Sequence, residues 1–175
     1  MEKIEHEMCP FCHTKNLTLT QDEVDIPFFG KTYVFAMDCT NCKYHKSDVE
    51  SAEIKDPVRI TFTVESEKDL NVRVVRSSTA SVKIPQMRMD VRPGPASDGE
   101  VTNIEGVINK FEKIIKQEAE DAEDDDVKKH AKNLLKKFWK VKLGDIPLKI
   151  VIEDPTGNSA IISDKAVIEK LKAVK

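Results

Sequence analysis

Cysteine is absent from most of this 175-residue chain: all four cysteines lie within the first 42 residues, and the remaining 133 contain none. No apolar run approaches the roughly 20 residues that a membrane-spanning helix needs. The first ten residues, MEKIEHEMCP, also lack the apolar core of a signal peptide. We therefore predict a soluble cytoplasmic protein without a framework of disulfides. The uneven distribution of cysteine predicts two modules.

Basic charge and histidine are scarce where several functions would need them. The net charge is −3, so no overall basic field favours binding of nucleic acid or anionic lipid. No histidine occurs between His45 and His130, which argues against an iron or zinc centre built from two histidines and a carboxylate in the second module. The chain also contains no G-x-S-x-G, P-loop or dinucleotide-binding motif. These absences predict a binding protein rather than an enzyme.

The four cysteines form two C-x-x-C pairs, Cys9 with Cys12 and Cys39 with Cys42, separated by 26 residues. One pair alone would also suit a redox dithiol of the glutaredoxin kind, but no apolar strand precedes Cys9 and a redox motif needs no second pair. Two such pairs, each in a tight knuckle, can supply the four thiolates of a tetrahedral zinc site. Because four thiolates leave no position for water, we predict one structural Zn²⁺ held by all four cysteines.

The segment between the two cysteine pairs has the alternating pattern of β-strands. Large apolar side chains recur at every second position, first at Leu17 and Leu19, then at Val24 and Ile26, and then at Tyr33, Phe35 and Met37. Residues 26–31, IPFFGK, form the bend between the strands. We therefore predict that residues 1–50 form a four-cysteine zinc ribbon from which a β-hairpin arm projects.

Residues 51–175 are predicted to form a second domain of antiparallel strands with an inserted helical hairpin. Alternation over residues 58–64, 70–74 and 82–91 predicts half-buried strands, with Pro85 at an edge or a bend. Apolar residues at helical spacing predict the hairpin at about 102–142, opened by a capping box of Thr102 and Glu105.

Three shorter segments complete the prediction for the second domain. Residues 118–126 hold seven acids and are predicted to be a solvated helix end, with an acidic docking tip for a basic partner as the alternative. Residues 154–159, DPTGNS, have the composition of a tight turn between strands, in which Pro155 presets φ and Gly157 supplies a positive φ. The last segment, from Ser163, is predicted to be a short amphipathic helix.

Several of these features occur together, in order, in one known family. They are the four-cysteine ribbon with IPFFG in its arm, then SAEI, the strand from Val58, EGVI at the start of a helix, and EDPTGNS. The chain resembles the ZPR zinc-finger family of archaea and eukaryotes nearly from end to end. Eukaryotic members resemble two such modules in tandem, whereas this chain has one, like the archaeal form. The resemblance implies a mainly β, α+β protein: a zinc ribbon followed by a double-stranded β-helix or jelly-roll-like domain with an inserted helical hairpin.

The resemblance also implies a partner. Eukaryotic members bind translation elongation factor one-alpha and assist its folding, so the archaeal factor is the client that we expect here. The candidate contact residues are in the arm and in the DPTGNS turn: Ile26, Pro27, Phe28, Phe29, Asp154, Pro155, Gly157, Asn158 and Ser159. An exposed pair of phenylalanines would be an apolar anchor for a client, but the same pair could instead dock the ribbon onto the second domain.

A nucleic-acid-binding ribbon acting in transcription or translation is the alternative function. Residues 1–50 contain five Lys or Arg and nine Asp or Glu, a net charge of 5 − 9 = −4. Contacts with phosphate need the opposite sign, so the charge of the ribbon disfavours this alternative.

Overall fold

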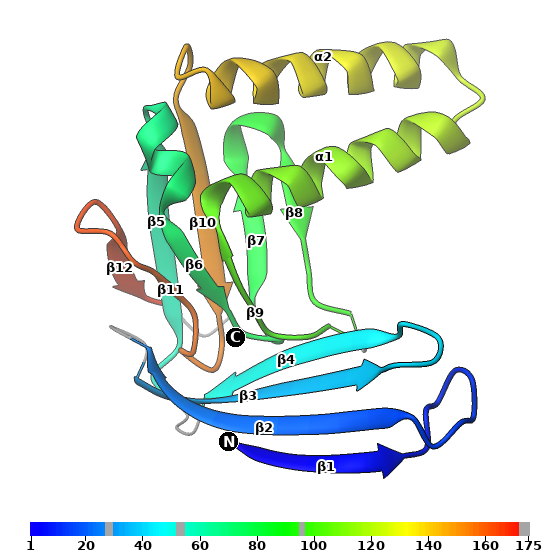
Figure 1. The fold of residues 1–175 in the computed structure, drawn as a ribbon. Coiled ribbons are helices and arrows are strands. Elements are labelled where there is room, and N and C mark those ends of the chain that lie inside the picture. Colours follow the sequence, from blue (N-terminus) through cyan, green and yellow to red (C-terminus); the bar gives the residue numbers. More distant parts are fainter. Residues whose placement is uncertain (27–29, 52–54, 95–96, 172–175) are drawn as a thin grey trace.

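A four-stranded antiparallel sheet forms the N-terminal part of the protein (Figure 1). The computed structural model describes residues 1–26, 30–51, 55–94 and 97–171. The strands of the sheet follow one another in chain order: β1 (Glu2–Glu7), β2 (Leu17–Ile26), β3 (Gly30–Cys39) and β4 (His45–Ser51). The long pair β2 and β3 corresponds to the predicted hairpin arm, whose tip, residues 27–29, lies outside the described residues.

The sequence pattern did not predict the outer strands β1 and β4. Every residue of β1 is exposed, so this strand has no buried face to impose an alternating pattern. Backbone pairing with β2 defines it instead, with Ile4 opposite Leu19. The register shifts before Glu7, where His6 has a φ of 64°, because a left-handed residue interrupts the regular ladder.

Two further sheets enclose the main core of the second domain. One has the order β12-β5-β10-β7-β8 and the other the order β11-β6-β9. Their strands are β5 (Val58–Val64), β6 (Arg73–Arg76), β7 (Ser81–Ile84), β8 (Met89–Val91), β9 (Glu100–Asn103), β10 (Leu148–Asp154), β11 (Ala160–Ile161) and β12 (Val167–Lys170). Short 3₁₀ turns cover Glu67–Asn71 and Pro85–Met87, and the second confirms the bend predicted at Pro85. The non-consecutive strand order is what periodicity alone could not predict.

The predicted helical hairpin is confirmed: α1 (Ile104–Asp121) and α2 (Asp125–Lys142) are inserted between β9 and β10. Their apolar stripes pack on the same core as the two sheets, and Phe111 and Phe138 are almost completely buried there. Neither of these described helices is long and apolar enough to cross a membrane. The predicted capping box is wrong by one residue, because α1 begins at Ile104 and its N-cap is therefore the residue after Thr102. Asn103 is the N-cap, and its Oδ1 accepts a 2.7 Å hydrogen bond from the amide of Gly106.

The predicted terminal helix is also wrong. Residues 167–170 form strand β12, which pairs antiparallel with β5 and places Ile168 opposite Ile60. A short isolated helix is marginal in water, whereas the edge of β5 offers backbone partners to a segment that begins with β-branched Val167 and Ile168. Tertiary pairing therefore outweighed the helical pattern.

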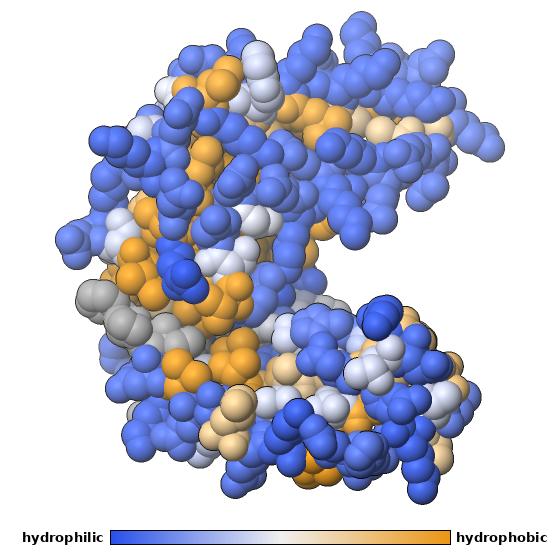
Figure 2. Space-filling model, in the orientation of Figure 1, coloured by the Kyte–Doolittle hydropathy of each residue, from blue (hydrophilic) through white to orange (hydrophobic). Residues whose placement is uncertain are grey.

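The N-terminal sheet is joined to the second domain along β4. Asp48 accepts a 2.7 Å hydrogen bond from the amide of Gly99, and Lys46 forms a 2.9 Å ion pair with Asp98. A Cβ at Gly99 would lie 2.2 Å from the carbonyl oxygen of Val49, so only glycine permits this approach. The surface is hollowed between this sheet and the helical hairpin (Figure 2). The ribbon and the hairpin are therefore two arms on one β scaffold.

Candidate metal centre

Each C-x-x-C pair folds into the same knuckle. The amide of His13 donates to the carbonyl of Cys9, and the amide of Lys43 donates to the carbonyl of Cys39, each at 3.0 Å. His13 and Lys43 occupy equivalent positions with φ values of 54° and 61°, which turns the chain sharply after the second cysteine of each pair. The two knuckles are therefore equivalent turns at the same end of the sheet, one before β2 and one after β3.

The four sulfur atoms converge. All four Sγ atoms lie within 4.8 Å of one another, with Cys9 to Cys42 at 3.7 Å and Cys12 to Cys39 at 3.6 Å. A tetrahedral zinc site with sulfur–zinc distances of about 2.3 Å has sulfurs about 3.8 Å apart, whereas a disulfide needs about 2.05 Å. The geometry therefore fits one Zn²⁺ with four thiolate ligands. Cys9 and Cys39 are buried, and Cys42 lies on the exposed side of the cluster.

The groups around the sulfurs lower the pKa of Cys12 and raise the pKa of Cys42. The side chain of Thr14, then its amide, and the side chain of Asn41 lower the pKa of Cys12 to about 5. The amide of Tyr44 favours the thiolate of Cys42, but burial and the neighbouring sulfurs outweigh it and raise the pKa of Cys42 to about 12. Four thiolates at these distances need a divalent cation to offset their repulsion, which is what a structural zinc ion supplies.

The DPTGNS turn is built around a buried carboxylate. Asp154 has no exposed surface, and it accepts hydrogen bonds from the hydroxyls of Ser77, Thr79 and Ser159 at 2.8, 3.0 and 2.6 Å. The amide and hydroxyl of Thr156 and the amide of Asn158 also donate to it. Burial alone would favour the neutral acid, but these donors, with Ser159 foremost, outweigh it and lower the pKa of Asp154. The turn therefore ties the end of β10 to the segment between β6 and β7.

The same turn holds the link to the ribbon. The amide of Lys55 donates to the carbonyl of Thr156 at 3.0 Å. Gly157 has a φ of 67°, and a Cβ on it would lie 2.2 Å from the carbonyl oxygen of Asp56. The positive φ predicted for Gly157 is therefore confirmed. Sequence reasoning did not foresee the close approach of the linker to this residue.

The predicted contact residues differ in what they expose. In the turn, Asp154, Gly157, Asn158 and Ser159 are buried, and Pro155 is exposed. In the arm, Pro27, Phe28 and Phe29 lie outside the described residues, and Ile26 is described only as the last residue of β2. The role of these residues in binding a partner stays a prediction.

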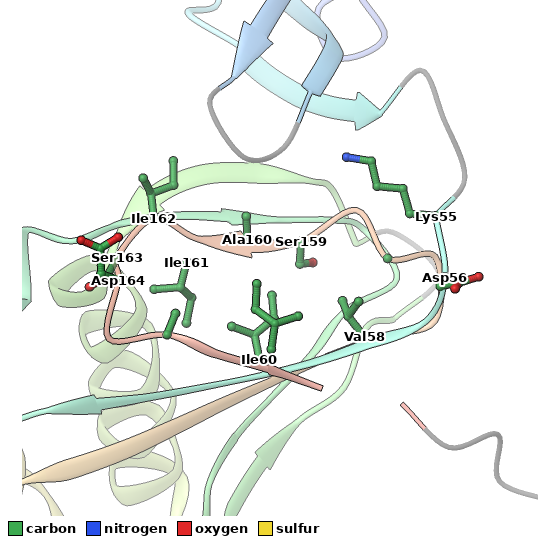
Figure 3. Close-up of a pocket in the computed structure, with 13 residues that line it drawn as sticks. Lys55, Asp56, Val58, Ile60, Ser159, Ala160, Ile161, Ile162, Ser163 and Asp164 are labelled. Atoms are coloured by element: carbon green, nitrogen blue, oxygen red, sulfur yellow. The ribbon is translucent and has the colours of Figure 1, made fainter. Parts of the chain in front are cut away.

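A cavity of about 570 Å³ lies beside the turn, between β5 and β11 (Figure 3). Ile60 and Ile161 point into it from the two sheets, and Lys55 and Asp56 border it on the side of the linker. The turn, the linker and the strands β5 and β11 therefore meet at one place.

Sequence reasoning missed an apolar face of the N-terminal sheet. The pairing register puts Ile4, Leu19 and Met37 side by side, with Phe35 next to them opposite Gln21. Ile4 is 55% exposed and the other three are half-buried around a hollow of about 180 Å³. The alternation of β2 and β3 marked three of these residues, but nothing in the charged segment before Cys9 indicated Ile4.

Comparison with protein families identifies both parts of the chain. The ZPR1 zinc-finger domain matches residues 3–56, and the ZPR1 jelly-roll domain matches residues 68–174. The chain belongs to the ZPR1 family. Its order of domains, a four-cysteine zinc finger followed by a jelly roll with a helical insert, is the one that the structure shows and the sequence predicted. In this zinc-finger family, the four-cysteine cluster is suited to hold one zinc ion.

The ZPR1 relatives include archaeal and eukaryotic proteins. A ZPR1-like protein of Methanocaldococcus jannaschii is 36% identical over 98% of this chain and 91% of its own length. The zinc finger protein ZPR1 of Drosophila melanogaster is 33% identical over 78% of this chain. A protein of Schizosaccharomyces pombe named zinc finger chaperone zpr1 is 30% identical over 78% of this chain. The match covers 30% of the length of each of these two eukaryotic proteins.

Proposed function

We propose that this protein is a zinc-dependent binding protein that binds translation elongation factor one-alpha and assists its folding in the cytoplasm. The observation that carries the proposal is the name of the S. pombe relative, zinc finger chaperone, together with a match that spans the zinc finger and the jelly roll of this chain. A chaperone needs a surface for a polypeptide, and a structural metal centre suits a role in shaping such a surface rather than in chemistry.

The apolar face of the N-terminal sheet supports this function. An exposed apolar centre surrounded by polar residues is the usual composition of a protein-binding patch. On the same face, Glu2 lies opposite Gln21, and Glu23 and Glu50 lie opposite Tyr33. This acidic border fits a client segment that carries both apolar and basic side chains. Ile26, one of the predicted contacts in the arm, is the last residue of β2, a strand of the same sheet.

The DPTGNS turn has a different part in the proposal. Its buried residues hold the linker and therefore set the position of the ribbon relative to the jelly roll. Among the predicted contact residues of the turn, Pro155 is exposed and can touch a client directly. Changes at Asp154 or Gly157 are then expected to weaken client binding through the placement of the ribbon.

A binding and refolding assay with purified elongation factor one-alpha tests the proposal. The factor is added in its GDP state, in its GTP state and after dilution from denaturant, and both complex formation and the yield of active factor are measured. We expect binding in at least one state and a higher refolding yield with the zinc-loaded protein. No binding in any of the three states contradicts the proposal.

A matched pair of variants assigns the surface. Ile4→Glu places a charge in the apolar face of the ribbon, and Ile168→Glu makes the same change on β12, where the side chain is 65% exposed. We expect Ile4→Glu to weaken binding at least about tenfold, the size of effect seen at an interface anchor, and Ile168→Glu to change it little. Equal effects of the two variants would exclude the ribbon face as the contact surface.

A further inference from the structure

Helix α2 carries a concentration of positive charge after its first turn. Seven lysines lie between Lys128 and Lys142, and no acid occurs between residues 127 and 144. Among the residues that the structure describes, the side chain of Lys142 has partners: it forms a 2.9 Å ion pair with Glu112 and a 2.7 Å hydrogen bond with Asn109. The side chains of the other six make no ion pair or hydrogen bond with any residue that the structure describes. Their ammonium groups are therefore available to a ligand.

The helix itself does not need these charges. Lys128, Lys132, Lys136 and Lys140 follow one another at four-residue spacing, and like charges at that spacing destabilise a helix. The helix dipole favours cations in the last turn, which accounts for Lys140 but not for the lysines of the first half. On α1, by contrast, lysines and acidic residues are mixed, as expected for a face that only meets solvent.

An exposed aromatic ring lies among these lysines. Trp139, the single tryptophan of the chain, is 63% exposed, and Leu143, one turn further along, is 44% exposed. The side of α2 that packs on the core is made by Ala131, Leu134, Phe138 and Val141. Trp139 is 100° away from Phe138 around the helix and lies on the outer side, three residues after Lys136. The core does not use this ring, and its place among unpaired lysines gives the outer side of α2 both an aromatic surface and positive charge.

We propose that the outer side of α2 binds single-stranded RNA. The binding surface, called here the lysine–tryptophan face, consists of Lys129, Lys132, Lys136, Lys140 and Trp139. The lysines contact successive phosphates, and one base stacks on the indole of Trp139. Proteins that bind single-stranded nucleic acid combine positive charges, which contact the phosphates, with aromatic side chains, on which the bases stack. The lysines and Trp139 provide both. An acidic polypeptide would match the charge but gives the exposed ring no comparable partner.

The acidic charge of the rest of the chain does not oppose this assignment. The net charge of −4 that disfavours nucleic acid at the ribbon belongs to residues 1–50. The strands of this segment form a sheet of their own, which does not include α2. At physiological salt, charges further away than about 8 Å are largely screened. The nearer acids, Asp124 to Asp126, lie at the start of α2 and limit the face to its remaining turns. The proposal is independent of the function proposed for the ribbon.

The single tryptophan provides the assay. Fluorescence of Trp139 in the full, zinc-loaded chain is followed during titration with oligouridylate of about 12 nucleotides, a length that spans a typical single-strand site. We expect saturable quenching at about 50 mM salt, and an affinity whose logarithm falls with the logarithm of salt concentration with a slope of about −3 for four phosphate contacts. The absence of saturable quenching overturns the proposal.

Charge-reversal variants locate the site. Lys132→Glu with Lys136→Glu is expected to lower the affinity at least about tenfold and to make the salt slope shallower by about 1.4, the value for two lost phosphate contacts. Lys113→Glu with Lys116→Glu makes the same change in charge on exposed positions of α1, and we expect less than about a twofold effect from it. Equal losses in the two double variants would overturn the proposal.

Two further measurements separate stacking from charge. Trp139→Ala, followed by fluorescence anisotropy of labelled oligouridylate, is expected to lose about tenfold in affinity with an unchanged salt slope. Oligoglutamate of the same length tests for an acidic polypeptide as the ligand. If oligoglutamate binds as tightly as oligouridylate, or if Trp139→Ala binds RNA like the unaltered protein, the assignment to RNA is overturned.

Discussion

The hydroxyl of Ser159 donates a 2.6 Å hydrogen bond to Oδ2 of Asp154, and both residues are buried at the junction of the ribbon linker and the jelly roll. A local turn does not require a serine at the end of the DPTGNS segment. The hydrogen bond to Asp154 explains why Ser159 is there. It also makes Asp154 the residue through which β10, the β6–β7 segment and the linker are connected.

Asp154→Asn is expected to destabilise the protein by about 3 kcal/mol, because the new amide group would face hydroxyl and amide donors in a buried site. Urea unfolding followed by circular dichroism measures the loss. Asp164→Asn, an equivalent change at an exposed residue, should stay within about 0.5 kcal/mol of the unaltered protein. A loss below about 1 kcal/mol for Asp154→Asn would mean that the hydrogen bonds of this carboxylate contribute little to stability.

The same carboxylate predicts a sensitivity to acid. The folded pKa of Asp154 is lowered, so its contribution to stability is present above the unfolded pKa of about 3.9 and is lost as the pH falls through that value toward the folded pKa. Thermal melts from pH 7 to pH 2 should therefore show a smaller acid-induced drop in Tm for Asp154→Asn than for the unaltered protein. Parallel pH profiles for the two proteins would contradict this assignment.

Gly157→Ala tests the close approach of the linker. The substitution combines a positive φ with a methyl group 2.2 Å from the carbonyl oxygen of Asp56, so we expect a loss of at least about 2 kcal/mol. Gly94→Ala is the control, since a Cβ at Gly94 has no neighbour within 4 Å among the described residues. Equal stability of the two variants in chemical denaturation would show that the linker can move away without cost.

Asn103→Ala tests the corrected start of α1. Loss of the cap on Gly106 should cost about 1 kcal/mol, whereas Asn103→Ser, which can cap in the same way, should recover most of it. Thermal unfolding of the two variants measures the difference. If serine behaved like alanine, the side chain of Asn103 would not be acting as the cap.

Much of the fold was predictable from local pattern. The spacing of the four cysteines indicated one metal site, because two C-x-x-C pairs have few other uses within one small module. The apolar stripes around Phe111 and Phe138 located both helices to within a few residues. In each case the signal and the structure lie in the same short segment.

The features that escaped prediction depend on contacts between distant segments. Strand β1 exists because its backbone pairs with β2, and β12 exists because β5 offers it an edge. Ser77 and Thr79, which donate to Asp154, are more than 70 positions away from it in sequence. The buried role of the DPTGNS turn was hidden for the same reason: its local composition describes a surface turn equally well.

Zinc binding and the stability of the ribbon should be lost together. Cys39 is 3% exposed and shares the cluster with three other sulfurs, so Cys39→Ser is expected to abolish stable zinc binding and unfold residues 1–50. We expect the jelly roll to keep a cooperative melt, because its core lies apart from the cysteine cluster. Hydrogen exchange resolved by segment measures both. A single transition of the whole chain on chelation would show that the two parts fold as one unit.

The metal content of freshly purified protein tests the central claim most directly. Elemental analysis combined with thiol titration should find one zinc ion per chain and four free thiols once the metal is chelated. Protein without stoichiometric metal, or with a disulfide inside either C-x-x-C pair, would contradict the account.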